Sequence, residues 1–256
     1  MKINILTLFP SMFEGFKSNS IIKRAIGKKI VDINVLNIRD FTKDKYGRVD
    51  TPCVGGGAGL IMKCQPIVDC LKSKCKNSFI ILTSAKGKKY TQVDARELSK
   101  KKNITIICGH YEGIDERISR YVDTSYSIGD FILTGGEIPS MVITDSVVRL
   151  LEGAITKESL DKESFEENLL EYSQYTEPYN FKGNKVPEIL YSGHHKAIEK
   201  FHRREQLVLT RKLRPDLFSK INLTKEDKKL LEEFDNKITP KWESEAIKKA
   251  KRFIKN

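Results

Sequence analysis

The stretch that decides the fold is Ile104-Thr105-Ile106-Ile107-Cys108, followed directly by Gly109-His110-Tyr111-Glu112-Gly113. The first half is rich in Ile and does not alternate strictly between apolar and polar residues, which predicts a strand buried on both faces. The second half is a loop with two glycines that begins where the strand ends. Loops after parallel strands are the usual ligand sites of α/β proteins, so this stretch predicts both a fold and a binding edge.

Similar strand-like runs recur on both sides of this stretch. The runs are Ile3–Phe9, Ile33–Ile38, Phe79–Thr83 and Ser127–Leu133. Between them lie segments with helical periodicity, which are Ser11–Ile26, Pro66–Lys74, Tyr90–Lys100 and Pro139–Leu151. This alternation of strands and helices predicts an α/β domain with a mostly parallel sheet.

The pattern changes after residue 156. A charged segment without clear periodicity predicts a linker over residues 161–175, and the Pro- and Gly-containing stretch that follows predicts irregular structure. After Gly193 the apolar residues recur at helical spacing in three successive segments. We therefore expect an α/β domain over residues 1–160 and a small helical domain over residues 176–256.

The composition limits the class of protein. Hydrophobic residues make up 39% of the 256 residues, which is typical of a globular chain. No apolar run approaches the roughly 18 residues that span a bilayer, and the short apolar start does not resemble a signal peptide. The five cysteines form no C-x-x-C pair and do not combine with histidines at zinc-ligand spacing. We expect a cytoplasmic protein with reduced thiols, no membrane association and no structural metal.

The formal net charge of +12 favours a polyanionic partner, of which nucleic acid is the commonest. A generally Lys-rich surface is the alternative. The densest basic segment runs from Lys196 to Arg214, where helical spacing brings together Lys200, Arg203, Arg204 and Arg211. These four side chains form a candidate RNA-binding stripe for phosphates, with a solvated helix face as the alternative reading.

Three loops carry residues that could take part in binding or catalysis. The segment Tyr46–Gly59 ends in the glycine cluster Gly55–Gly59, which is equally typical of a hinge and of a binding loop. In Cys108–Arg117, carboxylates crowd the expected start of a helix, where capping is the simple explanation, and His110 is compatible with a surface residue without a role. The third, Ser127–Glu137, leads into a helix that carries Arg149, which either forms a structural salt bridge or stabilises negative charge on a substrate.

Taken in order, these segments resemble one family, the bacterial tRNA (guanine-N1)-methyltransferases. The matching segments are Phe9-Pro10-x-Met12-Phe13, Gly55–Gly59, Cys108–Arg117, Ser127–Glu137, Asp145-Ser146-Val147-Val148-Arg149, Tyr175-Thr176-x-Pro178 and Val186–His195. Each motif alone is weak, but the ordered set is specific and extends from residue 1 to about residue 235.

The resemblance implies a fold and an assembly that periodicity alone does not. Enzymes of this family have a deep trefoil knot in the C-terminal half of their α/β domain, a SPOUT-like feature that is otherwise almost absent from proteins. They are homodimers with each active site at the interface, completed by the linker of the partner chain. The resemblance therefore implies a tRNA substrate with G at position 37, held by the helical domain and methylated next to the anticodon.

The resemblance also implies S-adenosylmethionine as the methyl donor, bound in the knotted loops. Transferred residue by residue, its pocket comprises Ser84, Gly109, Tyr111, Glu112, Gly113, Ile128, Gly129, Leu133, Gly135 and Gly136. The family also depends on Mg²⁺, although no metal-ligand pattern in the sequence indicates a site.

The same resemblance assigns catalytic roles. Arg149 matches the family's catalytic arginine, and Glu163 stands in Glu163-Ser164-Phe165 where the family has Asp as the general base. Asp161, two residues earlier, is the alternative base, and Glu171 matches a second acidic position. Ala85 replaces a usual Pro, and His110 stands where Arg is common. Two other functions stay open, a knotted methyltransferase with a ribosomal RNA target and a non-catalytic RNA-binding protein.

Overall fold

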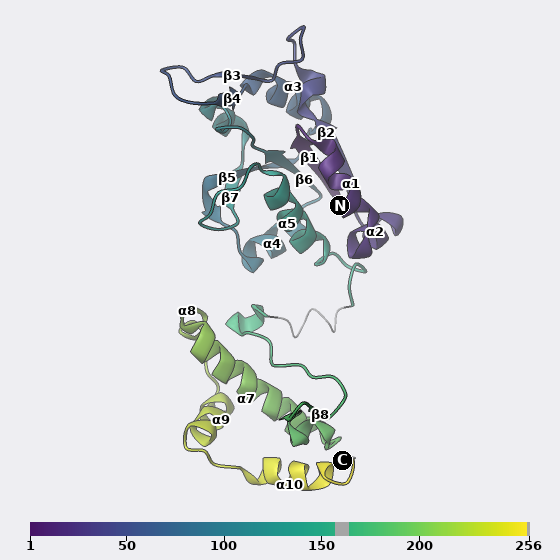
Figure 1. Cartoon of the computed structure of the whole chain (residues 1–256), viewed down its shortest axis with the longest axis vertical. Coiled ribbons are helices and arrows are strands. Elements are labelled where there is room, and N and C mark those ends of the chain that lie inside the picture. The colour runs from purple at the N-terminus through teal and green to yellow at the C-terminus, as the bar shows by residue number, and fades with distance from the viewer. Residues whose placement is uncertain (157–163, 255–256) are drawn as a thin grey trace. The chain divides into compact units, whose positions relative to one another are not determined.

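The computed structural model describes residues 1–156 and 164–254, and the chain divides into two compact units, Met1–Lys157 and Glu158–Asn256. Figure 1 shows the α/β unit in purple to teal and the helical unit in green to yellow. Asp161 and Glu163, the two candidate bases, lie outside the described residues.

The first unit contains a five-stranded sheet in the order β2-β1-β6-β5-β7. Every neighbouring pair is parallel, and the register aligns Ile3 with Ile104 and Ile5 with Ile106. The predicted α/β class with a parallel sheet is therefore confirmed. The strands are β1 (Lys2–Thr7), β2 (Asp32–Asn37), β5 (Phe79–Lys89), β6 (Asn103–Cys108) and β7 (Thr124–Ser127). A separate antiparallel hairpin comprises β3 (Asp50–Pro52) and β4 (Leu60–Met62).

Both faces of the sheet are buried, as the continuous apolar runs predicted. On one face, Ile3 and Ile104 pack in a core with residues of α2 (Ser20–Gly27), α4 (Gln92–Ser99) and α5 (Glu137–Val148). On the other face, Leu6 and Ile107 pack with residues of α3 (Cys64–Lys74). Polar side chains within the sheet are satisfied, since Asn4 donates to the hydroxyl of Thr105 at 3.3 Å.

The helices of the first unit follow most of the predicted segments. They are α1 (Glu14–Ser18), α2 (Ser20–Gly27), α3 (Cys64–Lys74), α4 (Gln92–Ser99) and α5 (Glu137–Val148), with 3-10 helices η1 (Pro10–Phe13), η2 (Ile38–Phe41) and η3 (Glu116–Tyr121). The single helix predicted over Ser11–Ile26 is wrong. Asn19 has an extended backbone and Ser20 a positive φ of 52°, so the chain breaks there into separate helices.

The strand predicted over Ser127–Leu133 is also wrong. β7 ends at Ser127, and residues 128–134 form bends instead. Phe131 and Ile132 are exposed in this structure, so the apolar run that suggested a buried strand is not buried in a core.

The second unit is mainly helical. Its elements are η4 (Glu166–Asn168), the hairpin β8 (Asn180–Phe181) and β9 (Asn184–Lys185), η5 (Glu188–Tyr191), α7 (His195–Leu213), α8 (Pro215–Phe218), α9 (Lys225–Asp235) and α10 (Lys241–Ala250). One small core joins Leu207 of α7 to Leu231 of α9, and it includes Leu169 from the segment predicted as linker. A second core joins Ala197 of α7 to Ala246 of α10.

Candidate functional site

A cavity of about 500 Å³ opens at the ends of β6 and β7, beside the middle of β5. The stretch Leu82–Lys86 of β5 and the loops after β6 and β7 line it, and Pro139 in the first turn of α5 completes it. All ten side chains or glycines proposed for the cofactor lie in its wall, namely Ser84, Gly109, Tyr111, Glu112, Gly113, Ile128, Gly129, Leu133, Gly135 and Gly136. The structure thus brings together residues that are more than 50 positions apart in the sequence.

Gly136 allows the loop before α5 to approach Gly109, in the loop after β6, closely. A Cβ on Gly136 would lie 2.7 Å from the backbone nitrogen of Gly109 and 2.2 Å from the hydroxyl of Thr83. The Gly136 N–H donates to the carbonyl of Gly109 at 2.7 Å, which fixes the two loops together. No residue larger than glycine fits at position 136 without moving backbone.

The wall contributed by β5 depends on an irregularity in that strand. Its pairing with β7 shifts register between Thr83 and Lys88, and a Cβ on Gly87 would lie 2.6 Å from the backbone of Ser125 and Tyr126. Ser84 and Ala85 lie within this irregular stretch and line the cavity. The segment Thr83–Gly87 is therefore part of a long strand that shapes the site.

A buried carboxylate behind the cavity was missed by the sequence reasoning. Glu137, at the start of α5, is only 2% exposed and accepts a hydrogen bond of 2.7 Å from the Thr7 hydroxyl of β1. Nδ1 of His110 lies 3.8 Å from its other oxygen and, within the described residues, has no hydrogen-bond partner. His110 lines the cavity and packs against Phe9 at a ring distance of 4.7 Å.

His110 is therefore not the surface residue without a role that the sequence allowed. The signal that could have found the pair is Gly135-Gly136-Glu137, where an acidic residue follows two glycines at a helix start. A carboxylate there suits the helix dipole, but only the structure shows that it is buried and faces a histidine.

Among the carboxylates of the loop after β6, Asp115 has the capping role that was expected. Asp115 accepts a hydrogen bond from the backbone N–H of Arg117 at 3.0 Å and caps η3. The Arg117 guanidinium also donates to it and holds the pKa of the Asp115 carboxyl well below its usual range. Asp115 is therefore an ionised structural group rather than a candidate acid or base.

The glycine cluster Gly55–Gly59 lies between β3 and β4, and its base is tied to the cavity. The Glu112 N–H donates to the carbonyl of Leu60 at 3.0 Å, and a Cβ on Gly59 would collide with the Glu112 side chain. Gly55, Gly56 and Gly57 all have positive φ, and a Cβ on any of them would meet no atom of the described residues within 4 Å. The cluster is thus an open hairpin loop next to the cavity.

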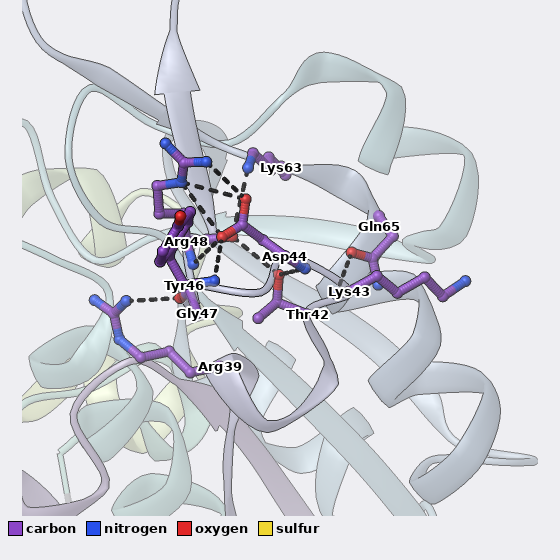
Figure 2. A network of polar contacts seen from close by, with 9 residues as sticks. All are labelled: Arg39, Thr42, Lys43, Asp44, Tyr46, Gly47, Arg48, Lys63 and Gln65. Atoms are coloured by element: carbon purple, nitrogen blue, oxygen red, sulfur yellow. Dashed lines mark hydrogen bonds and ion pairs between the residues drawn. The ribbon is translucent and has the colours of Figure 1, made fainter.

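The loop that precedes this hairpin is held by one carboxylate, as Figure 2 shows. Asp44 accepts from the backbone N–H of Tyr46 at 2.8 Å and from the Arg48 guanidinium at 3.1 Å. These donors, the Arg48 guanidinium first, lower the pKa of Asp44 from 3.8 to about 2. Arg39 donates to the Gly47 carbonyl at 3.2 Å and to the Tyr111 hydroxyl at 3.4 Å, which connects this loop to the cavity wall.

Arg149 lies at the C-terminal end of α5, where its backbone N–H donates to the Asp145 carbonyl at 3.1 Å. Its side chain is half-buried. Glu171, the second acidic position, belongs to the other unit, where its N–H donates to the Ser164 hydroxyl at 3.0 Å and its carboxylate accepts from Gln174. In the described parts of the chain, no group of three or more His, Cys, Asp or Glu side chains could hold a metal ion.

The four cations of the predicted RNA-binding stripe are ion-paired within the second unit. Their partners are Glu226 for Lys200, Asp227 and Glu167 for Arg203, Glu243 for Arg204, and Asp235 for Arg211. Arg204 donates two hydrogen bonds of 2.6 and 2.7 Å to Glu243, and its side chain is only 11% exposed. Arg203 and Arg204 therefore join α7 to α9 and α10.

Sequence comparisons identify the relatives of this chain. The family model of the tRNA (Guanine-1)-methyltransferase TrmD matches residues 1–220. A tRNA (guanine-N(1)-)-methyltransferase of Clostridium botulinum (strain Langeland) is 50% identical over 241 residues, covering 93% of this chain and 100% of the relative. The enzyme of the same name from Clostridium tetani is 52% identical, covering 90% of this chain and 97% of the relative. In residues 1–156 and 164–254, no helix is long and apolar enough to cross a membrane.

Proposed function

This chain belongs to the tRNA (guanine-N1)-methyltransferase family and is an enzyme of that class, and on this premise we propose that it methylates N1 of guanine 37, next to the anticodon of tRNA. The methyl donor is S-adenosylmethionine. The observation that supports this donor is the cavity at the ends of β6 and β7 and beside the middle of β5, whose wall contains all ten residues expected from the family.

The cavity fits such a donor by its shape and by its polar atoms. Its volume of about 500 Å³ lies within the range of small-molecule sites. Glycine backbone at positions 109, 113, 135 and 136 lets a ligand approach main-chain N–H and C=O groups, which read adenine and ribose without bulky side chains. When bound, S-adenosylmethionine supplies an electrophilic methyl group, so the protein has to supply position and charge.

Two side chains are proposed to activate the guanine. Its N1 carries a proton and is a poor nucleophile until that proton leaves, so Glu163 accepts the proton, a role worth roughly 10²–10⁴-fold in rate. Arg149 stabilises the negative charge that develops on O6. The target base has to leave the stacked anticodon loop to reach these groups. Asp161 is the alternative proton acceptor.

Further parts of the proposal rest on the family. These are the trefoil knot, a homodimer with the active site at the interface, and a cytoplasmic location. The homodimer is supported by exposed apolar side chains beside the cavity, Ile138 and Val142 on α5 and Met12 on η1, which a second copy would cover. Mg²⁺ is also part of the proposal, with phosphate or substrate oxygens as its ligands, and no catalytic step is assigned to it.

The helical unit is proposed to hold the tRNA. The overall charge of +12 supports this role, whereas the ion-paired Arg203 and Arg204 do not. Lys200 and Arg211 are the more exposed members of the predicted stripe and are the ones we assign to phosphate contacts. Their carboxylate partners, Glu226 and Asp235, would have to exchange with phosphate when tRNA binds.

The proposal is tested by methyl transfer from labelled S-adenosylmethionine to an unmodified tRNA transcript with G at positions 36 and 37, beside a transcript with G37 replaced by A. Label confined to the first transcript is expected. Label in ribosomal RNA but not in tRNA would favour the rival RNA target. If the protein bound neither S-adenosylmethionine nor tRNA, this result would contradict the enzyme assignment.

The assignment of the base is tested by a pair of substitutions. Glu163→Gln should abolish turnover and leave the affinity for S-adenosylmethionine unchanged, because an amide cannot accept the proton. Asp161→Asn is the matched control and should retain activity. An active Glu163→Gln enzyme together with an inactive Asp161→Asn enzyme would transfer the role to Asp161.

A further inference from the structure

The second unit contains a cavity that none of the assigned roles uses. It has a volume of about 390 Å³ and lies between the segment after Glu171, the residues around η5 and one side of α7. Four of its wall residues carry aromatic rings, which are Tyr172, Tyr175, Tyr191 and His202. These four rings lie around one hollow and belong to neither of the two hydrophobic cores of the unit.

The rings are arranged for stacking. Tyr172 and His202 lie parallel, with ring centroids 3.6 Å apart and an interplanar angle of 4°. This is the separation at which aromatic planes are in van der Waals contact. Tyr175 is 45% exposed, so its ring is available to a ligand in the cavity. A flat heteroaromatic ligand entering this space meets aromatic rings as well as the aliphatic side chains of Val186 and Leu190.

The cavity is held in shape by the surrounding backbone. The N–H of Ser173, between the two tyrosines, donates to the carboxylate of Glu205 on α7 at 3.1 Å. The N–H of Leu170 donates to the hydroxyl of Thr210, also on α7, at 2.8 Å. Both bonds fix the segment that carries Tyr172 against the helix that carries His202, so the stacked pair is preorganised before any ligand binds.

One polar side chain in the wall, Glu177, could recognise the edge of a ligand by hydrogen bonding. The Glu177 carboxylate lies in the wall and accepts a hydrogen bond of 3.1 Å from the Tyr191 hydroxyl. Burial of the Tyr191 hydroxyl and its bond to Glu177 raise the pKa of Tyr191, so Tyr191 stays a donor at neutral pH. The remaining acceptor capacity of the carboxylate suits N–H groups on the edge of a nucleobase.

A neighbouring hollow offers a place for the rest of the strand. It shares Glu177 and Tyr191 with the aromatic cavity and includes Lys185 of β9 in its wall. An ammonium group beside stacked rings is the combination that single-stranded nucleic acid sites use, in which bases stack on aromatic side chains and cations follow the backbone. A peptide would not require both features.

We propose that this aromatic cavity binds one unpaired nucleobase of the tRNA, by stacking on its tyrosine rings and by a hydrogen bond to Glu177. The proposal rests on the proposed function for the choice of RNA. It assigns the second unit a base-specific contact in addition to phosphate contacts, and every residue in the wall of the aromatic cavity belongs to that unit.

The test uses the full-length protein and unmodified tRNA transcripts. Tyr175→Ala should weaken tRNA binding roughly 5- to 150-fold, because loss of one stacked base costs about 1–3 kcal/mol. Phe234→Ala is the matched control, since Phe234 is equally exposed in the same unit and does not line the cavity. It should bind tRNA like the wild type, and both variants should keep the wild-type affinity for S-adenosylmethionine.

A second measurement locates the base. Transcripts with 2-aminopurine at single unpaired positions should show one position whose fluorescence is quenched by wild-type protein and by Tyr172→Phe, but not by Tyr172→Leu or Tyr175→Ala. Tyr172→Phe keeps the ring, so its rescue separates stacking from loss of folding.

The outcomes distinguish this site from the proposed function. Suppose that the wild-type protein transfers the methyl group and that Tyr175→Ala and Tyr172→Leu bind tRNA with the same Kd as Phe234→Ala. That result would overturn the nucleobase site and leave the proposed function intact. A wild-type protein that binds S-adenosylmethionine but no tRNA would overturn the proposed function and the site together.

Discussion

The two units of this protein are built by different physical means. The cavity of the first unit depends on backbone shape, because glycines such as Gly136 let three loops touch. The helices of the second unit depend on charge, because Arg203, Arg204 and Arg211 each pair with a carboxylate of another helix. The comparison shows that three arginines of the most basic segment link helices of the second unit, whereas loops that contain glycine form the proposed methyl-donor site.

The sharpest way to break this comparison is to remove one buried charge. Arg204→Ala should lower the free energy of unfolding of the second unit by about 3–5 kcal/mol, because Glu243, which is 12% exposed, loses its partner. Chemical denaturation measures the loss. Arg211→Ala is the control and should cost about 0–1 kcal/mol, since its pair with Asp235 is exposed.

The same variant decides between the two readings of the stripe. At a temperature where Arg204→Ala is folded, the salt dependence of tRNA binding should equal that of the wild type, because Arg204 makes no phosphate contact. A flatter salt dependence with unchanged stability would restore Arg204 to the RNA-binding surface. Replacing Arg204 and Glu243 together with methionines should recover most of the stability, since it leaves no unpaired charge.

The next largest effect is expected in the glycine loops. Gly136→Ala should cost about 1–3 kcal/mol of stability and should abolish measurable binding of S-adenosylmethionine, because its Cβ would collide with the backbone of Cys108 and Gly109. Calorimetric titration and thermal unfolding measure the two effects. Gly15→Ala is the matched control in α1, where a Cβ meets no atom of the described chain within 4 Å. It should stabilise the unit slightly, because alanine favours a helix over glycine.

The smallest effect concerns the one carboxylate that organises a loop of the first unit. The folded-state pKa of Asp44 is about 2, below the value of 3.8 for the unfolded chain. A depressed pKa gives a stability contribution that is complete above about pH 4 and is lost as the pH falls through about 2. The stability difference between wild type and Asp44→Asn should therefore shrink over this window in urea titrations. A difference that is constant from pH 6 to pH 2 would contradict the pairing with Arg48.

Much of the first unit follows from local sequence. Apolar runs such as Ile104–Cys108 specify their own strands, so the parallel sheet could be predicted from local sequence, whereas the ten residues of the cavity wall were predicted from the family resemblance. The break at Asn19 and Ser20 was missed because it depends on backbone angles that helical periodicity does not report. The run after Ser127 was mistaken for a strand because apolar character alone does not distinguish a core from an exposed loop.

What the sequence could not provide is the identity of partners that are distant along the chain. The contact between Thr7 and Glu137 joins residues 130 positions apart, and the pair formed by Arg204 and Glu243 joins residues 39 positions apart. Counting charges predicted a surface for phosphates, but how readily a cation can contact RNA also depends on the carboxylate with which it pairs and on how exposed that pair is. The three-dimensional arrangement decides that question, and it does so differently for each arginine.

The strand order has a consequence for the emergence of this protein from the ribosome. β1 can pair with β2 as soon as residue 37 has been synthesised, but its other edge pairs with β6, which ends at residue 108. Because nascent chains grow at about 5–20 residues per second, β1, an interior strand of the sheet, waits several seconds with one edge open. During this interval an apolar strand edge is exposed to other nascent chains, so chaperone binding to the first 100 or so residues should matter most for the yield of this protein.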